Sequence, residues 1–326
     1  MESTIKELEI RDLTIHYVTD DGTVQAVNHL NLEIFKGETL GLVGETGAGK
    51  TTTALGIMQI VPDPPGRIIG GEILFEGENL LEKTEAQMRN VRGNQISMIF
   101  QDPMTALNPV HTVGKQIAEV VALHRALGQK EALQQAIEIL EKVGIPGDRH
   151  REYPHQFSGG MRQRVVIAIA LACNPDLLIA DEPTTALDVT IQAQVLSLMK
   201  ELKEEFETSM LLITHDLGVV ATVCDKVAIM YAGNIVEYTT KENLFTEPKH
   251  PYTIGLFGSI PNPDTDEGRL KPIVGLMPDP TNLPTGCPFH PRCDQAMEDC
   301  SEISPGDVEV APGHFVKCLL YTKGKV

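Results

Sequence analysis

The sequence predicts an α/β protein built on a largely parallel sheet. Short apolar runs, typical of buried parallel strands, alternate with stretches whose apolar residues recur every three or four positions, as in helices. A chain of 326 residues, 42% hydrophobic and 22% charged, has the composition of a globular protein and not of a disordered or fibrous one. This length predicts two domains, or one core with a sizeable appendage.

The expected elements follow in chain order. Two alternating stretches, separated by a turn at Asp20–Gly22, predict a pair of strands near the N-terminus. Helical periodicity runs through most of 113–173, which predicts an inserted helical subdomain over about 101–173, and it returns over 191–206. The expected strands are 8–17, 24–35, 39–43, 96–100, 177–180, 211–214 and 227–231.

Composition changes near residue 241. The remainder of the chain is rich in proline and holds four of the six cysteines, and no long helix or strand is evident after Leu256. We therefore expect a domain over 1–240 and a loop-rich, cysteine-bearing appendage over 241–326. Such a segment buries little apolar surface and would need a staple to become ordered, so we expect the nucleotide core to fold independently of it.

The net charge of the chain limits the kinds of molecule that it can bind. A net charge of −18 argues against a nucleic-acid-binding surface, which needs fields of Lys and Arg, but it leaves room for a local phosphate site. No apolar run is long enough to span a bilayer, and the first residues lack the apolar core of a signal peptide. We expect a soluble, cytosolic chain.

A phosphate-binding loop follows the predicted strand 39–43. Residues 44–51 spell G-x-x-x-x-G-K-T between a strand and a plausible helix, the context that a P-loop requires. Its glycines let successive N–H groups surround phosphates, Lys50 adds a positive charge there, and the Thr51 hydroxyl is suited to Mg²⁺. A chance glycine-rich turn is the weaker alternative.

Two acids complete this prediction. Asp181 and Glu182 end the apolar strand 177–180. Asp181 suits the Mg²⁺ role of a Walker B aspartate, and Glu182 can polarise the attacking water. Alone, the pair would be an ordinary surface turn; with the P-loop it predicts hydrolysis of ATP.

Further motifs carry a family resemblance. The segments 157–164 (FSGGMRQR), 100–103 (FQDP), 185–188 (TALD) and 214–216 (THD) resemble the signature motif, Q-loop, D-loop and H-loop of ABC-transporter ATPases. The order matches over about residues 5–240, although Met161 departs from the commoner glutamine. The segments PKHPYT (248–253) and GCPFHPRC (286–293) resemble the peptide and nickel importer subfamily.

The resemblance implies roles for individual residues. Glu182, His215 and Gln101 would be catalytic, with Gln101 also sensing the Mg²⁺ held by Thr51 and Asp181. Tyr17 would stack on adenine, and Asp188 would order the seam of a head-to-tail dimer in which Ser158, Gly159 and Gly160 meet the partner's ATP. The implied nucleotide-binding residues are Tyr17, Gly44, Thr46, Gly47, Ala48, Gly49, Lys50, Thr51, Thr52, Ser158, Gly159, Gly160 and Asp188.

The resemblance also implies the setting of this activity. It implies an ATPase at the cytoplasmic face of the membrane, working with two permease subunits, a second ATPase subunit (identical or a paralogue) and, indirectly, an extracytoplasmic peptide-binding protein. The cargo would be di- or oligopeptides, or a nickel complex. Two other functions stay open, a permease-free ABC ATPase and an iron–sulfur redox protein with a vestigial P-loop.

Four cysteines in the appendage form a candidate metal site. Cys287, Cys293, Cys300 and Cys318 are spaced C-x5-C-x6-C-x17-C, without the C-x2-C pair usual for structural zinc. Four soft thiolates on loops suit an iron–sulfur cluster, and the resemblance implies [4Fe–4S] here. Zinc and free or disulfide-linked thiols remain the alternatives.

Overall fold

The computed structural model describes residues 5–185, 187–259 and 272–322, so Ala186 of the TALD motif and part of the segment after Leu256 lie outside the described residues. A smaller antiparallel sheet has the order β2-β1-β4-β5, and a larger one the order β11-β12-β10-β9-β3-β8-β7-β6. Strands β9, β3, β8, β7 and β6 are parallel to their neighbours in that central run. The strands are β1 (Lys6–Thr19), β2 (Gly22–Phe35), β3 (Thr39–Val43), β4 (Gly66–Phe75), β5 (Glu78–Asn79), β6 (Ile96–Ile99), β7 (Leu177–Asp181), β8 (Ser209–Thr214), β9 (Lys226–Tyr231), β10 (Asn234–Thr240), β11 (Val308–Ala311) and β12 (His314–Val316).

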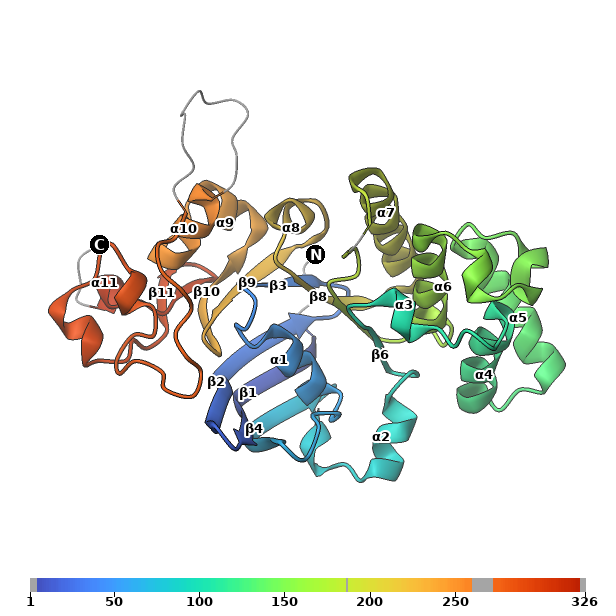
Figure 1. The fold of residues 1–326 in the computed structure, drawn as a ribbon, viewed down its shortest axis with the longest axis horizontal. Coiled ribbons are helices and arrows are strands. Elements are labelled where there is room, and N and C mark those ends of the chain that lie inside the picture. The colour runs from blue at the N-terminus through green and yellow to red at the C-terminus, as the bar shows by residue number, and fades with distance from the viewer. Residues whose placement is uncertain (1–4, 186, 260–271, 323–326) are drawn as a thin grey trace.

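The helices lie in separate groups along the long axis of the molecule. Figure 1 shows the predicted helical insertion, which contains α4 to α6, at one end and the cysteine-bearing C-terminal region at the other, with α1 between them. The helices are α1 (Lys50–Ile57), α2 (Glu85–Val91), α3 (Pro103–Ala106), α4 (Val113–Arg125), α5 (Gln129–Lys142), α6 (Gly159–Leu171), α7 (Val189–Phe206), α8 (Leu217–Val223), α9 (Lys241–Thr246), α10 (Pro251–Gly258) and α11 (Leu319–Thr322).

Both faces of the central parallel strands of the larger sheet are buried. Along β8, Met210 and Leu212 belong to the core shared with the helices, whereas Leu211 and Ile213 belong to the core shared with the smaller sheet. Successive side chains of a strand point to opposite faces, so a strand covered on both sides shows a continuous apolar run. This confirms the α/β interpretation and explains why these strands were recognisable in the sequence.

Strands β4 and β10 were absent from the expected set. Gly66, Gly70 and Gly71 interrupt the apolar pattern of β4, and Gly71 has φ +103°, a conformation that other residues rarely adopt. In β10 the pattern is broken by Glu237, an acid that is nevertheless 1% exposed. Its partners, described below, come from outside the strand.

The C-terminal region adds strands to the edge of the larger sheet. β12 pairs with β10 in antiparallel register, Glu237 opposite Val316 and Tyr238 opposite Phe315, and β11 pairs with β12. Glu237 accepts hydrogen bonds from the N–H groups of Lys249 and His250 (both 2.8 Å), and the His314 ring lies 2.7 Å away. The region is therefore joined to the core through backbone pairing and a buried polar cluster.

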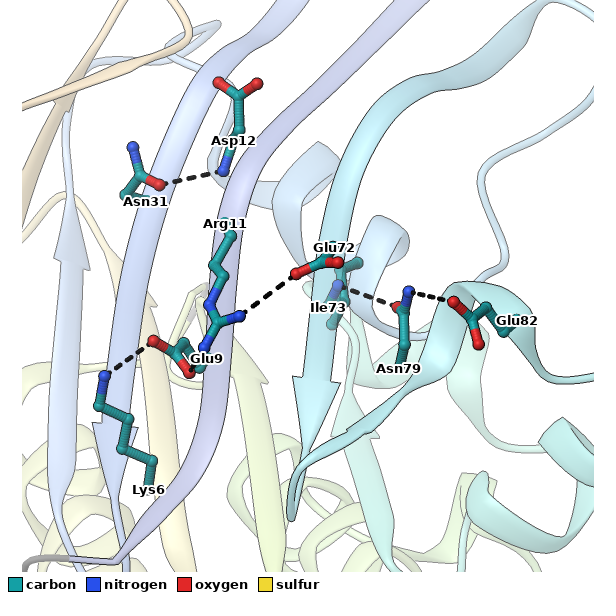
Figure 2. Close-up of polar contacts among 9 residues, drawn as sticks. All are labelled: Lys6, Glu9, Arg11, Asp12, Asn31, Glu72, Ile73, Asn79 and Glu82. Atoms are coloured by element: carbon teal, nitrogen blue, oxygen red, sulfur yellow. Dashed lines mark hydrogen bonds and ion pairs between the residues drawn. The ribbon is translucent and has the colours of Figure 1, made fainter.

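The smaller sheet has a face covered by exposed polar contacts. Arg11 contacts Glu9 at 2.7 Å and Glu72 at 3.4 Å, and Lys6 contacts Glu9 at 2.8 Å (Figure 2). The Arg11 side chain is 53% exposed. Ion pairs this exposed contribute little to stability, typically below about 1 kcal/mol.

Candidate functional site

The phosphate loop lies between β3 and α1, as the sequence predicted. All five residues of β3 are buried, and α1 begins at Lys50. The loop passes so close to its neighbours that a Cβ on Gly44 would lie 2.2 Å from the Met230 carbonyl oxygen, and one on Gly49 would lie 2.3 Å from that of Ala26. Gly49 also has φ +107°. Glycine is therefore required at both ends of the loop.

Lys50 is folded back on the loop. Its Nζ donates to the carbonyl oxygens of Gly44 (2.7 Å) and Glu45 (3.0 Å). Burial lowers the pKa of Lys50, while the charges of Glu182, Asp181 and Glu45 oppose that shift. The ammonium group thus lies among the acids of the site with only carbonyl partners, which a phosphate could replace.

Asp181 and Thr51 present a donor set that fits Mg²⁺. Asp181 ends β7, is 2% exposed, and its Oδ1 has no hydrogen-bond partner. Burial raises the pKa of this carboxyl, and a hydrogen bond with the Thr51 side chain opposes the shift. A buried carboxylate oxygen without a partner, beside a hydroxyl, is the kind of oxygen site that Mg²⁺ prefers.

Glu182 is surrounded by the two other predicted catalytic residues. Its carboxylate accepts from Gln101 Nε2 (2.9 Å) and Thr185 Oγ1 (3.0 Å), and His215 Nδ1 lies 3.0 Å away. Burial would raise the pKa of Glu182, but the bonds from His215, Gln101 and Thr185 outweigh it and keep the pKa below its usual value. Glu182 also has φ 47°, the sort of backbone strain that clusters at functional sites.

Tyr17 lies beside the start of α1. Its hydroxyl is 3.4 Å from Thr52 Oγ1, and Gly66 packs against its ring so closely that a Cβ there would lie 2.8 Å from Cε1. Tyr17 is thus near the phosphate loop. Its stacking on adenine stays a prediction.

Ser158 and Gly159 of the signature motif and Asp188 of the D-loop lie at the surface. Ser158 caps α6 by accepting from the Met161 N–H (3.4 Å), and Asp188 caps α7 by accepting from the Ile191 N–H (3.0 Å). The two caps are neighbours, since a Cβ on Gly160 would lie 2.5 Å from Ile191 Cγ2. Ser158, Gly159 and Asp188 are exposed and available to a second molecule.

The four cysteines of the C-terminal region line one small cavity. Cys287, Cys293, Cys300 and Cys318 surround about 10 Å³, together with His250 and His290. All four are free thiols, so the structure contains no disulfide among them. Within residues 5–185, 187–259 and 272–322, no group of three or more His, Cys, Asp or Glu is arranged to hold a metal ion. The cavity is therefore a convergence of thiols without a formed metal site.

The C-terminal region makes a contact to the phosphate loop that the sequence did not predict. Arg292, beside Cys293, forms a two-bond ion pair with Glu45, and the Glu45 N–H donates to the Tyr252 hydroxyl (3.0 Å). Arg292 and Glu45 are 247 positions apart. No local pattern in a single sequence signals such a contact.

Comparisons with known proteins agree with this geometry. The family model described as "ABC transporter" matches residues 27–185, and that described as "Oligopeptide/dipeptide transporter, C-terminal region" matches 236–300. Two solved structures, an ATP-binding cassette dimer in a post-hydrolysis state with ADP and phosphate and cbiO1 of Clostridium perfringens, share 26% identity and a TM-score of 0.64. They correspond to 72% and 77% of this chain and 98% and 95% of their own.

Full-length relatives are closer in sequence. The dipeptide transport ATP-binding protein DppD of Bacillus subtilis is 50% identical over 97% of this chain and 95% of its own length. The oligopeptide transport ATP-binding protein OppD is 54% identical in B. subtilis (96% and 88%) and 50% in Salmonella typhimurium (96% and 93%). The chain belongs to the ABC-transporter ATPases, in the group that carries the oligopeptide/dipeptide C-terminal region.

Proposed function

We propose that this chain hydrolyses Mg·ATP at the edge of the larger sheet and thereby powers import of di- or oligopeptides through partner permease subunits. The observation that carries the ATPase part is the convergence of Lys50, Asp181 and Glu182 at the carboxyl ends of β3 and β7. The peptide cargo is supported by relatives named as dipeptide and oligopeptide transport proteins that align over nearly the whole chain.

The residues of the site divide the work of hydrolysis. Lys50 and the loop N–H groups would bind the phosphates, and Mg²⁺ held by Thr51 and Asp181 and sensed by Gln101 would neutralise charge on them. Glu182, kept ionised by its hydrogen bonds, would orient the attacking water and accept its proton. His215 and Gln101 hold the Glu182 carboxylate in place.

A second ATPase subunit would complete the site. Ser158, Gly159 and Gly160 are at the N-terminus of α6, where backbone N–H groups attract anions; Ser158 and Gly159 are exposed and Gly160 is half-buried. They would bind the phosphates held by the partner, identical or a paralogue, with Asp188 beside them at the seam. None of the described helices is long and apolar enough to cross a bilayer. Because its relatives are named as transport ATP-binding proteins, the chain would sit at the cytoplasmic face of the membrane through its permease subunits.

Isolation from the native membrane tests the transport role. Affinity-tagged chain, solubilised in detergent, should bring down two integral-membrane subunits, and their reconstituted ATPase activity should rise with a peptide-loaded binding protein. Recovery of an active ATPase without membrane subunits would instead favour a permease-free ATPase. Stimulation by a nickel complex but not by peptide would identify the other cargo.

We also propose that the four C-terminal cysteines hold a [4Fe–4S] cluster. The support is their convergence on one cavity as free thiols, since four soft thiolates suit iron–sulfur ligation and structural zinc favours shorter Cys spacings. Its role would be structural, because the surrounding segment is short of apolar burial.

Metal analysis tests the cluster. Anaerobically purified protein should be brown with about four iron and four sulfide per chain, and Cys300→Ser should lower both. Cys173→Ser, at a buried thiol elsewhere, is the matched control and should leave the iron content unchanged. Stoichiometric zinc, or no metal at all, would contradict the cluster.

A further inference from the structure

The cysteine-bearing segment, residues 287–318, contacts the phosphate loop through the side chain of Arg292. Residues His290–Arg292 form a 3₁₀ turn between Cys287 and Cys293. From this turn, Arg292 Nη1 and Nη2 donate to the two carboxylate oxygens of Glu45 at 2.7 and 3.1 Å. The Arg292 side chain is 7% exposed. Such a two-bond pair is directional as well as strong, and it fixes how the turn and the loop lie relative to each other.

Glu45 is held at each of its polar groups. Its carboxylate accepts from Arg292, its N–H donates to the Tyr252 hydroxyl, and its carbonyl accepts from Lys50 Nζ. Arg292 and Tyr252 both belong to the C-terminal region. The second residue of the phosphate loop is therefore positioned from outside the ATPase core, on both its side chain and its backbone.

An aromatic cluster makes this support rigid. The rings of Tyr231, Tyr252 and Phe289 lie 4.6 to 5.4 Å apart, and the Arg292 guanidinium lies 5.8 Å from the Tyr231 ring, with Nη1 3.4 Å from the Tyr231 hydroxyl. Tyr231 ends β9, Tyr252 is in α10, and Phe289 adjoins the cysteine turn. Movement of the cysteine turn is thus transmitted to Arg292 rather than absorbed by loose packing.

We propose that Arg292 is a positioning residue of the ATPase: it fixes Glu45 at the start of the phosphate loop and makes nucleotide affinity depend on the order of the four-cysteine segment. This rests on the proposal that residues 44–51 hold the phosphates. A loop already fixed by Arg292 and Tyr252 binds phosphate without first losing conformational freedom, whereas a released loop must be ordered by the nucleotide itself.

Arginine substitutions in the full-length chain test this. Arg292→Gln should raise the dissociation constant of a fluorescent ATP analogue about tenfold and raise KM with little change in kcat, because Glu182 and its partners are untouched. Arg292→Lys, which keeps the charge but loses the fork, should recover part of the affinity. Arg11→Gln is the control: it also removes an arginine paired with glutamate, but an exposed one remote from the loop, and it should change affinity less than twofold.

A second variant tests the proposal if Arg292→Gln does not fold. Tyr252→Phe removes only the hydroxyl that accepts from the Glu45 N–H and keeps the aromatic cluster, so it too should weaken nucleotide binding. Parental affinity in Arg292→Gln, or in Tyr252→Phe if Arg292→Gln does not fold, would overturn the proposal. Lys50→Ala separates the two proposals, because normal binding in that variant would overturn the phosphate site itself, whatever Arg292 does.

Whether the cysteines act through Arg292 is tested by combining two substitutions and measuring nucleotide affinity. Cys293→Ser should weaken nucleotide binding, and the double variant Cys293→Ser/Arg292→Gln should be no weaker than Arg292→Gln alone, because both act through one contact. Effects that multiply, or a Cys293→Ser variant with parental affinity, would show that the cysteine segment does not act through Arg292 and would overturn that part of the proposal.

Discussion

The phosphate loop and the cysteine segment are both turn-rich stretches, yet different interactions order them. The loop is bounded by β3, buried at every residue, and by α1, so apolar burial on both sides of the sheet fixes its ends. The cysteine segment is preceded by exposed apolar side chains, Val274 at 82% and Leu276 at 90%, and is joined to the core through the ring of Phe289 and through polar contacts. One half of the site is thus ordered by the core sheet, whereas the other half depends on one aromatic cluster and a few buried ion pairs and hydrogen bonds.

Removing the carboxylate of Glu182 should produce the largest effect on the core side of this comparison. Glu182→Gln is nearly isosteric but cannot accept a proton, so kcat should fall by about 10²–10⁴ while ATP binding is kept. The variant should accumulate as an ATP-bound dimer in size-exclusion chromatography. Glu72→Gln, on the exposed face of the smaller sheet, is the control with parental turnover. A parental rate in Glu182→Gln would show that another group is the base.

Removing the charge of Lys50 should weaken the binding of ATP. Lys50→Ala deletes an ammonium group that donates to the loop carbonyls, and the dissociation constant for ATP should rise about 10- to 100-fold, the worth of a hydrogen bond to a charged group. Lys6→Ala, at an exposed lysine of β1, should bind ATP normally. Undiminished affinity in a fluorescent-nucleotide titration of Lys50→Ala would place the phosphates elsewhere.

On the other side of the comparison, Glu237→Gln should loosen the C-terminal region. Glu237 is buried and accepts from two N–H groups as well as facing His314, so the amide should cost about 1–3 kcal/mol of stability. The change should appear as earlier proteolysis after Leu256, ahead of global melting. Glu33→Gln, in β2, is the control. Cleavage at the parental rate would mean that backbone pairing alone holds the region.

The smallest expected effect is a change in how the melting temperature depends on pH. Burial lowers the pKa of His250 to about 4, although Glu237 and a hydrogen bond with the Lys317 backbone oppose the shift, and its neutral Nδ1 accepts from the Tyr252 N–H at 3.0 Å. An unfolded histidine has a pKa near 6.5, so this group's contribution is complete above about pH 6.5 and is lost as pH falls toward 4. His250→Asn keeps a capping acceptor but does not titrate, so its melting temperature should fall less than the parent's between pH 7 and pH 5. Equal slopes would contradict this.

The sequence predicted the core better than the contacts between distant segments. Strands such as β3, β7 and β8 are apolar on both faces, and the motifs at their ends therefore converge at one edge, which is where Lys50, Asp181, Glu182 and His215 lie. β4 was not recognised because glycines break its pattern, and β10 because its buried acid is satisfied from the residues just before α10 and from β12. The ion pair between Arg292 and Glu45 joins residues 247 positions apart, so it depends on tertiary packing and no local pattern predicts it. The expectation that the nucleotide core folds independently of the appendage can be tested at this contact.

The pairing of β12 with β10 limits how the chain can be shortened. A truncation before residue 314 would remove β12 and leave β10 as an open edge next to β9, with its outward N–H and C=O groups free to pair with another chain. It would also remove His314 from the buried Glu237 carboxylate. An ATPase core cut out for crystallisation or assay would thus carry a template for aggregation, and a soluble version needs charged or proline substitutions along β10, or the intact hairpin.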